Sequence, residues 1–143
     1  MLELNFNLNV VDNWPPVSKE ALPCTKIGDK YRIEAVPLFI KGLSIGDILE
    51  VRLSEISGMV DNWKIVEKSG NSTIWLLRLK GNPDIESKLE YLKFLGCNTA
   101  SLTKLGCYAI SVPKNCFIDL VDHCLDELDE NMVGIAYPSF RHE

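Results

Sequence analysis

The sequence lacks the features that mark nucleic-acid-binding, exported and membrane-spanning proteins. Of its 143 residues, 15 are Lys or Arg and 20 are Asp or Glu, and the net charge of −5 argues against a general nucleic-acid binder, which usually has a basic face. The first residues, MLELNFNLNVV, have neither the basic segment nor the continuous apolar segment of a signal peptide. No apolar run approaches the roughly 20 residues that span a bilayer. We therefore expect a cytoplasmic protein with no direct nucleic-acid or membrane partner.

Histidine and paired cysteine, on which many metal and catalytic sites depend, are also scarce. The histidines are His123 and His142, and the cysteines, which form no C-x-x-C pair, are Cys24, Cys97, Cys107, Cys116 and Cys124. This odd number predicts reduced, mostly buried thiols. His123 and Cys124 would point about 100° apart on a helix, so they form no nucleophilic pair, and His123 with Asp119 and Glu127 is no closed metal-ligand set. We therefore expect no enzyme, no metal and no cofactor, and we expect His142 to lie in a frayed C-terminus.

Short strands and turns fill the first half of the sequence. Leu2 to Val10 alternates apolar with polar residues, which is the period of a strand with one buried face. Pro residues and Gly-Asp pairs separate the later β-type runs, so we expect strands at 2–10, 24–26, 31–36, 48–53 and 63–67. Together these strands predict a small open antiparallel barrel. The strand at 2–10 either pairs within this barrel or, at an edge, adds to the sheet of a partner.

From Thr73 the pattern alternates strands with two amphipathic helices. The expected strands are 73–79, 97–102, 107–112 and 133–137. We expect the first helix to start at the Asn82 cap and to end at Gly96, and the second to start at Pro113–Asn115. The second helix has apolar residues at helical spacing that we expect to be buried: Phe117, Leu120, Val121, Cys124 and Leu128.

This β-α-β-β-α-β order is that of a ferredoxin-like fold. The runs at 73–79 and 107–112 are the most apolar, as the two central strands of such a sheet should be. The sequence therefore predicts an α+β protein whose two subdomains pack as one compact unit. Residues 1–72 form an antiparallel β-barrel-like subdomain, with 1–11 as an added N-terminal strand, and residues 73–143 form the ferredoxin-like subdomain.

A small polar segment joins the two halves and allows two interpretations. It consists of Ser69, Gly70, Asn71, Ser72 and Thr73. The backbone N–H groups of such a Ser/Gly turn can bind a phosphate, particularly where a helix follows. Here the β-type run from Ile74 to Leu77 follows, which favours a structural turn. The sequence leaves both a ligand-binding turn and a purely structural turn open.

The region of the second helix contains acidic residues but neither Lys nor Arg between Cys116 and Val133. The acids are Asp119, Asp122, Asp126, Glu127, Asp129 and Glu130. Acids near a helix C-terminus oppose the helix dipole and repel one another, so stability alone does not favour them. One interpretation is an ordinary solvated helix face. The other is a contact surface for a basic protein, because complementary charge accelerates docking.

Four short motifs occur in a fixed order along the chain. They are Tyr31-Arg32 with Val36-Pro37-Leu38-Phe39, Gly42 with Gly46-Asp47, Ser69-Gly70-Asn71-Ser72-Thr73-Ile74, and Leu95-Gly96-Cys97. In this order they resemble a bacterial family known only as domain of unknown function 4265, over about residues 24–137. The resemblance implies the fold and its boundaries, but no activity. Asn71 and Trp75 stand where the family motif usually has His and Arg, and an amide cannot replace a His as an acid–base group.

The function that we expect is a non-enzymatic protein-binding inhibitor. Small size, the absence of an assembled catalytic set and the acidic helix favour an immunity protein that neutralises a bacterial toxin. Its partner would be a basic toxin domain such as a nuclease, whose substrate channel the six acids could occupy in place of phosphates. The alternative is a small-ligand-binding sensor or regulatory domain, by analogy with other ferredoxin-like folds.

Overall fold

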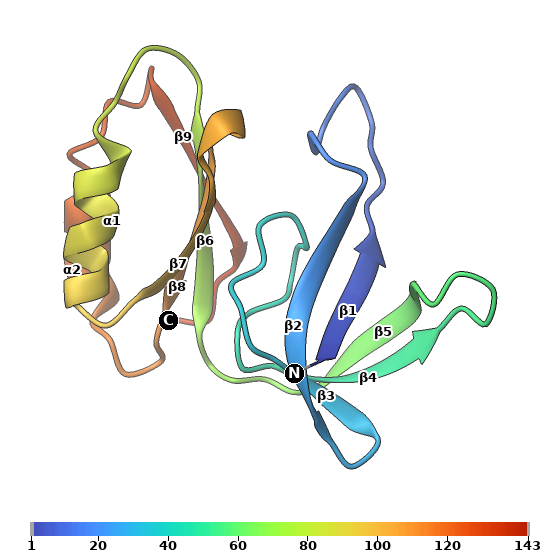
Figure 1. Ribbon diagram of the computed structural model, residues 1–143. Coiled ribbons are helices and arrows are strands. Elements are labelled where there is room, and N and C mark those ends of the chain that lie inside the picture. Colours follow the sequence, from blue (N-terminus) through green and yellow to red (C-terminus); the bar gives the residue numbers. More distant parts are fainter. Residues whose placement is uncertain (1, 143) are drawn as a thin grey trace.

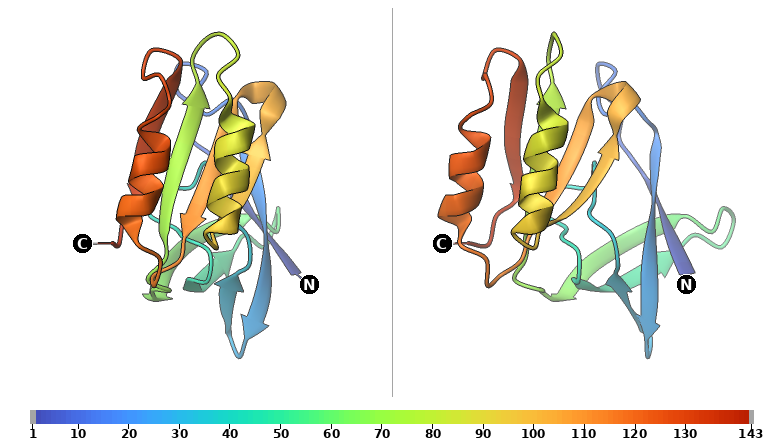
Figure 2. Two further views of the ribbon diagram at one scale, coloured as in Figure 1. Left: turned by 90° about the vertical axis from the view of Figure 1, so that its left-hand side faces the viewer. Right: turned by 60° about the vertical axis from the view of Figure 1, so that its left-hand side comes forward.

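The computed structural model describes residues 2–142, which fold into two halves lying side by side (Figure 1). One half is a ring of five strands, and the other is a four-stranded sheet with two helices. Both helices lie on the face of the sheet that points away from the ring, as the turned views of Figure 2 also show. Each half has its own apolar core. The chain is therefore an α+β protein, as the sequence predicts.

The first half is a closed barrel in which the strands follow one another in chain order. The strands are β1 (Leu2–Asn7), β2 (Lys19–Ile27), β3 (Lys30–Ile33), β4 (Ile48–Leu53) and β5 (Val60–Glu67). Consecutive strands are antiparallel, and the ring closes where Phe6 of β1 pairs in parallel with Val60 of β5. Leu4 and Phe6 enter the barrel core, so the N-terminal strand pairs within its own barrel. The expectation of an open barrel is wrong because β1 supplies the strand that closes it.

The second half is an antiparallel sheet with the strand order β7-β8-β6-β9. Its elements are β6 (Ser72–Arg78), α1 (Ile85–Phe94), β7 (Asn98–Leu102), the 3₁₀ turn η1 (Thr103–Leu105), β8 (Cys107–Val112), α2 (Ile118–Leu125) and β9 (Val133–Ser139). The two inner strands, β6 and β8, are the two most apolar runs of the sequence. All six residues of β8 are buried. The outer strands are β7, which is polar, and β9, which contains a proline near its end.

Side chains on one face of the sheet pack against both helices. Ile74 and Leu76 of β6 alternate with residues that point to the barrel side, and they form a core with Leu89 and Leu92 of α1 and Val121 of α2. This arrangement leaves the opposite face of β6, β8 and β9 turned toward the barrel (Figure 1). The α1 cap is Asp84, whose carboxylate accepts the N–H of the third residue of the helix, two positions after the expected Asn82 cap.

The second helix starts later than the sequence pattern predicts, and this changes its buried face. Pro113 accepts a turn hydrogen bond from the N–H of Cys116, and the helix begins only at Ile118. Phe117 precedes the helix in an extended conformation and is 77% exposed, and Leu120 is 46% exposed. Both were expected in the core. The buried residues are instead Val121, Cys124 and Leu125, with Leu128 packed beside them.

Candidate functional site

The segment Ser69–Thr73, here named the junction turn, joins β5 to β6 and bonds back to the barrel. The Ser69 N–H donates to Asp47 Oδ1 at 2.9 Å, and the Asn71 N–H donates to Ser69 Oγ at 3.2 Å. The Asn71 side-chain amide donates to Ile45 O at 2.9 Å. The Ser69 and Asn71 N–H groups are therefore used within the chain, which removes two donors that a phosphate would need.

The junction turn makes further bonds with both halves. The Lys114 N–H donates to Asn71 Oδ1 at 3.1 Å, so the Asn71 amide links a barrel loop to the turn before α2. Thr73 Oγ1 lies 2.8 Å from Ser44 Oγ and donates to Leu43 O at 3.3 Å. Asn71, the residue that departs from the family motif, thus has a bridging role that an amide can perform through its donor and acceptor.

The junction contains a largely buried ion pair. The Asp47 carboxylate accepts the N–H groups of Ser44 and Ser69, each at 2.9 Å. The Arg141 guanidinium pairs with the same carboxylate in a bidentate manner, with Nη2 at 2.8 Å from Oδ2 and Nη1 on Oδ1. The Asp47 side chain is 0% exposed and that of Arg141 is 11% exposed. This pair binds the C-terminal segment to the barrel half, because Arg141 and Asp47 are 94 positions apart in the sequence.

Beside this pair, the C-terminal segment forms a Ser–His–carbonyl chain. His142 Nδ1 lies 2.6 Å from Ser72 Oγ, and Nε2 lies 2.7 Å from Pro113 O. The Ser72 Oγ also accepts the Arg141 N–H at 2.7 Å. Serine, histidine and an orienting acceptor are the parts of a nucleophilic site, but Ser72 is 0% exposed, so a substrate carbonyl could not reach it. The expectation of a frayed His142 is wrong, because these two bonds hold its ring.

The six predicted acidic contact residues do not form one row on one helix. Helix α2 ends at Leu125, so the last four of them lie beyond it, on the turns that lead to β9. Glu127 forms an ion pair with Lys88 of α1 at 3.0 Å, and Asp129 accepts the Asn131 N–H at 2.9 Å. The remaining four form no ion pair within residues 2–142, and we name them the acidic stripe: Asp119, Asp122, Asp126 and Glu130.

Asp122 has the most unusual environment in the acidic stripe. Burial raises the pKa of Asp122, the negative charges of Asp126 and Asp119 raise it further, and a hydrogen bond from the Tyr137 hydroxyl lowers it in part. The Asp122 Oδ1 atom is buried and has no hydrogen-bond partner within residues 2–142. Such an acceptor lacks compensation for its lost hydration, so this carboxylate costs the folded chain free energy.

Exposed apolar side chains lie next to the acidic stripe, on the outer strand β9 and directly after its end. Tyr137 is 48% exposed and Phe140 is 41% exposed, and their rings meet edge to face with centroids 5.7 Å apart. Ile135 is exposed on the same strand. Aromatic residues beside charged groups are typical of protein contact surfaces.

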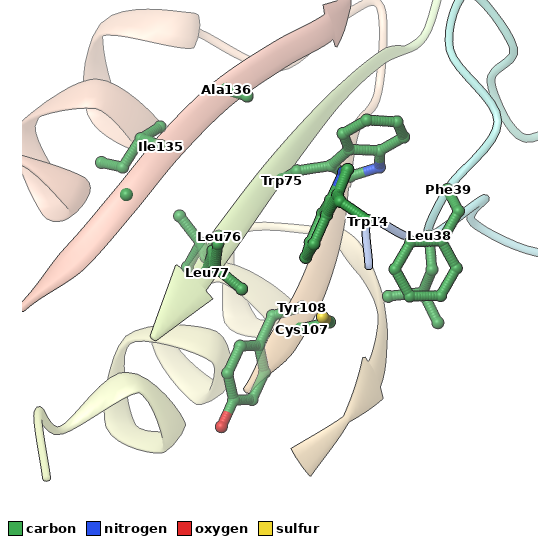
Figure 3. Close-up of a pocket in the computed structure, with 11 residues that line it drawn as sticks. Trp14, Leu38, Phe39, Trp75, Leu76, Leu77, Cys107, Tyr108, Ile135 and Ala136 are labelled. Carbon is green, nitrogen blue, oxygen red and sulfur yellow. The ribbon is translucent and has the colours of Figure 1, made fainter. Parts of the chain in front are cut away.

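An apolar groove of about 320 Å³ opens between the two halves, on the face of the sheet that the helices leave free (Figure 3). Its floor is formed by β6, β8 and β9, and Trp75 pairs across the sheet with Ala136. Trp14, Leu38 and Phe39 of the barrel half form its wall. The groove was not predictable from the sequence pattern. The one signal in the sequence was the departure from the family motif at Trp75.

Loop residues 37–39 at the wall are fixed from two sides. The Trp75 indole N–H donates to Pro37 O at 2.9 Å. The Glu20 carboxylate accepts the N–H groups of Leu38 at 2.7 Å and Phe39 at 3.0 Å. Burial raises the pKa of Glu20, and these two bonds offset part of that rise. The groove is therefore shaped by bonds that do not depend on a ligand.

Thiols and imidazoles form no further site in the described span. Within residues 2–142, no three His, Cys, Asp or Glu side chains are arranged to hold a metal ion. All five cysteines are free, and burial, with the neighbouring Cys116 thiol, raises the pKa of Cys97 to about 12. Cys97 is therefore a neutral thiol at physiological pH. In the same span no helix has both the length and the apolar character needed to cross a bilayer.

Comparisons with known proteins support the fold and the family. No curated protein matches the sequence. A crystal structure of a hypothetical protein from Neisseria gonorrhoeae is similar over 100% of this chain and 99% of that chain, with a TM-score of 0.74 and 16% sequence identity. At this identity the likeness concerns the fold alone. The family model described as a domain of unknown function, DUF4265, matches residues 20–134, and the chain therefore belongs to the DUF4265 family.

Proposed function

We propose that the protein acts by binding rather than by catalysis, as an immunity protein that inhibits a bacterial toxin. The observation that carries this proposal is the crowding of like charge at Asp122, a partly buried carboxylate whose pKa is raised by burial and by the neighbouring charges of Asp126 and Asp119. An arrangement of this kind destabilises the free protein, and a cationic side chain of a partner would relieve it. A partner that reduces the repulsion between these carboxylates would explain why the sequence has acids at positions where they destabilise the free protein.

The partner that fits this surface is a basic protein domain. No ion pair within residues 2–142 involves the carboxylates of the acidic stripe, and Tyr137, Phe140 and Ile135 provide apolar contact area next to it. Charge complementarity would guide the encounter, and the aromatic residues would provide the short-range contacts that hold the complex. A nuclease toxin is the favoured class, because the substrate channel of a nuclease is built to receive phosphates.

Affinity capture of the tagged protein from its native cells, eluted by stepped salt, tests this function. We expect one stoichiometric basic partner, released only at high salt. In purified form, the partner should associate about tenfold or more slowly with a triple variant, Asp119→Lys, Asp122→Lys and Asp126→Lys, and the salt dependence should largely disappear.

A matched triple variant on the barrel serves as control: Glu55→Lys, Asp61→Lys and Glu67→Lys. These acids are also exposed, so the change in net charge is the same. Its association rate should stay closer to that of the wild type. Equal rates for both variants would refute the acidic stripe as the contact surface. Capture of no protein partner would refute the inhibitor function itself.

A second candidate function is a small-ligand sensor, and the groove between the halves favours it. Its volume of about 320 Å³ lies at the lower end of the range for small-molecule sites. A ligand that binds only the folded chain raises its melting temperature. A screen of nucleotides, phosphates, amino acids and apolar compounds by thermal shift therefore tests it, and a screen without any shift argues against a sensor.

We further propose that residues 1–72 act as a barrel subdomain and residues 73–143 as a ferredoxin-like subdomain of one unit. The strand order β7-β8-β6-β9, in which the first and third strands of this half are central, supports that assignment. A cytoplasmic location is part of the same proposal and is supported by five cysteines that remain free.

A further inference from the structure

The geometry points to the groove between the halves as a binding site for a small, flat, uncharged aromatic molecule. This inference goes beyond the inhibitor role, because it uses none of the residues of the acidic stripe, and it rests on the second candidate function. Eleven residues line the groove and none of them is charged: Trp14, Leu38, Phe39, Trp75, Leu76, Leu77, Cys107, Tyr108, Gly134, Ile135 and Ala136.

The floor of the groove leaves room above the sheet. In the pairing register, Ala136 and Gly134 of β9 lie opposite Trp75 and Leu77 of β6, so all four belong to the same face. A small side chain and a glycine beside an indole leave room along the Trp75 ring within this groove. Figure 3 shows the Trp14 side chain near Trp75. A flat molecule would occupy this space with its faces against aromatic carbon.

The outer wall depends on a tight hairpin turn that presents Trp14. Val11 and Trp14 exchange two backbone hydrogen bonds of 2.9 and 3.0 Å, and Asp12 and Asn13 between them have positive φ angles of 53° and 64°. Two non-glycine residues in this conformation form a type I′ turn. The turn holds the Trp14 ring edge to face with Phe39, with centroids 6.1 Å apart, although the ring stays 46% exposed.

The chemistry of the lining selects an uncharged ligand. A charged group placed here would lose its hydration without an opposite charge or an array of donors in return. The Trp75 N–H is already bonded to Pro37 O, and the Cys107 thiol is directed to Leu105 O at 3.6 Å. The surface of the site is therefore apolar and aromatic. Hydrogen bonds between residues 37–39 and the side chains of Glu20 and Trp75 fix its wall in the absence of a ligand, which lowers the cost of binding.

A fluorescence titration with N-phenyl-1-naphthylamine, an uncharged aromatic probe, tests the site. We expect saturable binding with one probe per chain. Trp14→Ala removes a wall and Ala136→Leu fills the space along Trp75, so each should weaken binding about tenfold or more. Anilinonaphthalene sulfonate, which has nearly the same rings and a negative charge, should bind about tenfold more weakly than the neutral probe.

Phe117→Ala is the matched control, because it removes an aromatic ring that is 77% exposed and remote from the groove. Probe affinity should not change in this variant. Thermal melts establish that each variant is folded, and Trp14 is exposed enough for its variant to remain so. Non-saturable binding, equal affinity in the Trp14 and Phe117 variants, or equal affinity for the sulfonated probe would overturn the inference. A polar ligand that raises the melting temperature equally in wild type and Ala136→Leu would support a sensor with a site elsewhere.

Discussion

At the scale of single residues, Asp122 connects the stability of the chain with its proposed function. Its carboxylate is partly buried, lies near Asp119 and Asp126, and has one oxygen without a partner within the described span. Burial and like charge both favour the protonated form, so the pKa is raised in the folded state. A sequence selected for stability alone would have an amide here.

The replacement Asp122→Asn should stabilise the protein at neutral pH. Because the folded pKa is raised, the stability that protonated Asp122 contributes is fully present below its unfolded pKa and is lost as the pH rises through its folded pKa. The amide avoids that loss, so we expect a gain of about 1 kcal/mol in the free energy of unfolding at pH 7. The gain should shrink towards zero at about pH 3, where both states of the wild type are protonated.

Urea denaturation at the two pH values measures this difference. Asp61→Asn, at an exposed position on the barrel, is the control and should be nearly neutral at both. A wild type that is as stable as Asp122→Asn at pH 7 would contradict the account of this carboxylate. A more stable variant that also loses the partner would show that Asp122 serves binding at the expense of stability.

At the scale of elements, the sequence predicts the bounds of a strand or helix correctly where its local residue pattern agrees with the contacts made in the fold. The strands β4 and β8 begin and end at the predicted residues, because turn residues bound each run. The start of α2 was not predictable in the same way. Pro113–Asn115 has the composition of a cap, but the chain there forms a turn whose backbone bonds to Asn71 and His142. Since those partners are distant in sequence, local propensity could not reveal that the helix starts later.

Two phenylalanines test this distinction between pattern and packing. Phe6 is 3% exposed at the seam where β1 closes the barrel, and Phe117 is 77% exposed before α2. We expect Phe6→Ala to cost about 3–5 kcal/mol in the free energy of unfolding, because it leaves a cavity. Phe117→Ala should change it by about 0.5 kcal/mol or less. Chemical denaturation of both variants measures the difference, and similar costs would contradict the buried face assigned to α2.

At the scale of the whole molecule, the contacts that join the halves were beyond sequence reasoning. The groove combines residues from both halves, and the junction combines Asp47, the junction turn and Arg141. The family motifs contain Asp47 and the turn without indicating that they meet. Two separate cores linked by such a junction would otherwise unfold independently. The contacts that couple them include the buried ion pair, the Asn71 amide and the hydrogen bonds of Thr73 with Ser44 and of Trp75 with Pro37.

Removal of Arg141 should therefore weaken the whole fold as well as the C-terminal segment. Arg141→Ala leaves the Asp47 carboxylate buried without its cation, and we expect a loss of about 3 kcal/mol in the free energy of unfolding. Arg32→Ala breaks a more exposed pair with Glu34, which solvent screens, and should cost much less. Hydrogen exchange separates this coupling from a general loss of stability. In the wild type, amides of β2 and β8 should exchange with similar free energies of opening, since one cooperative event exposes both. In Arg141→Ala the two strands should diverge, because each half can then open while the other stays folded. Equal protection of β2 and β8 in the variant, together with a small loss of stability, would mean that the halves are held together by other contacts.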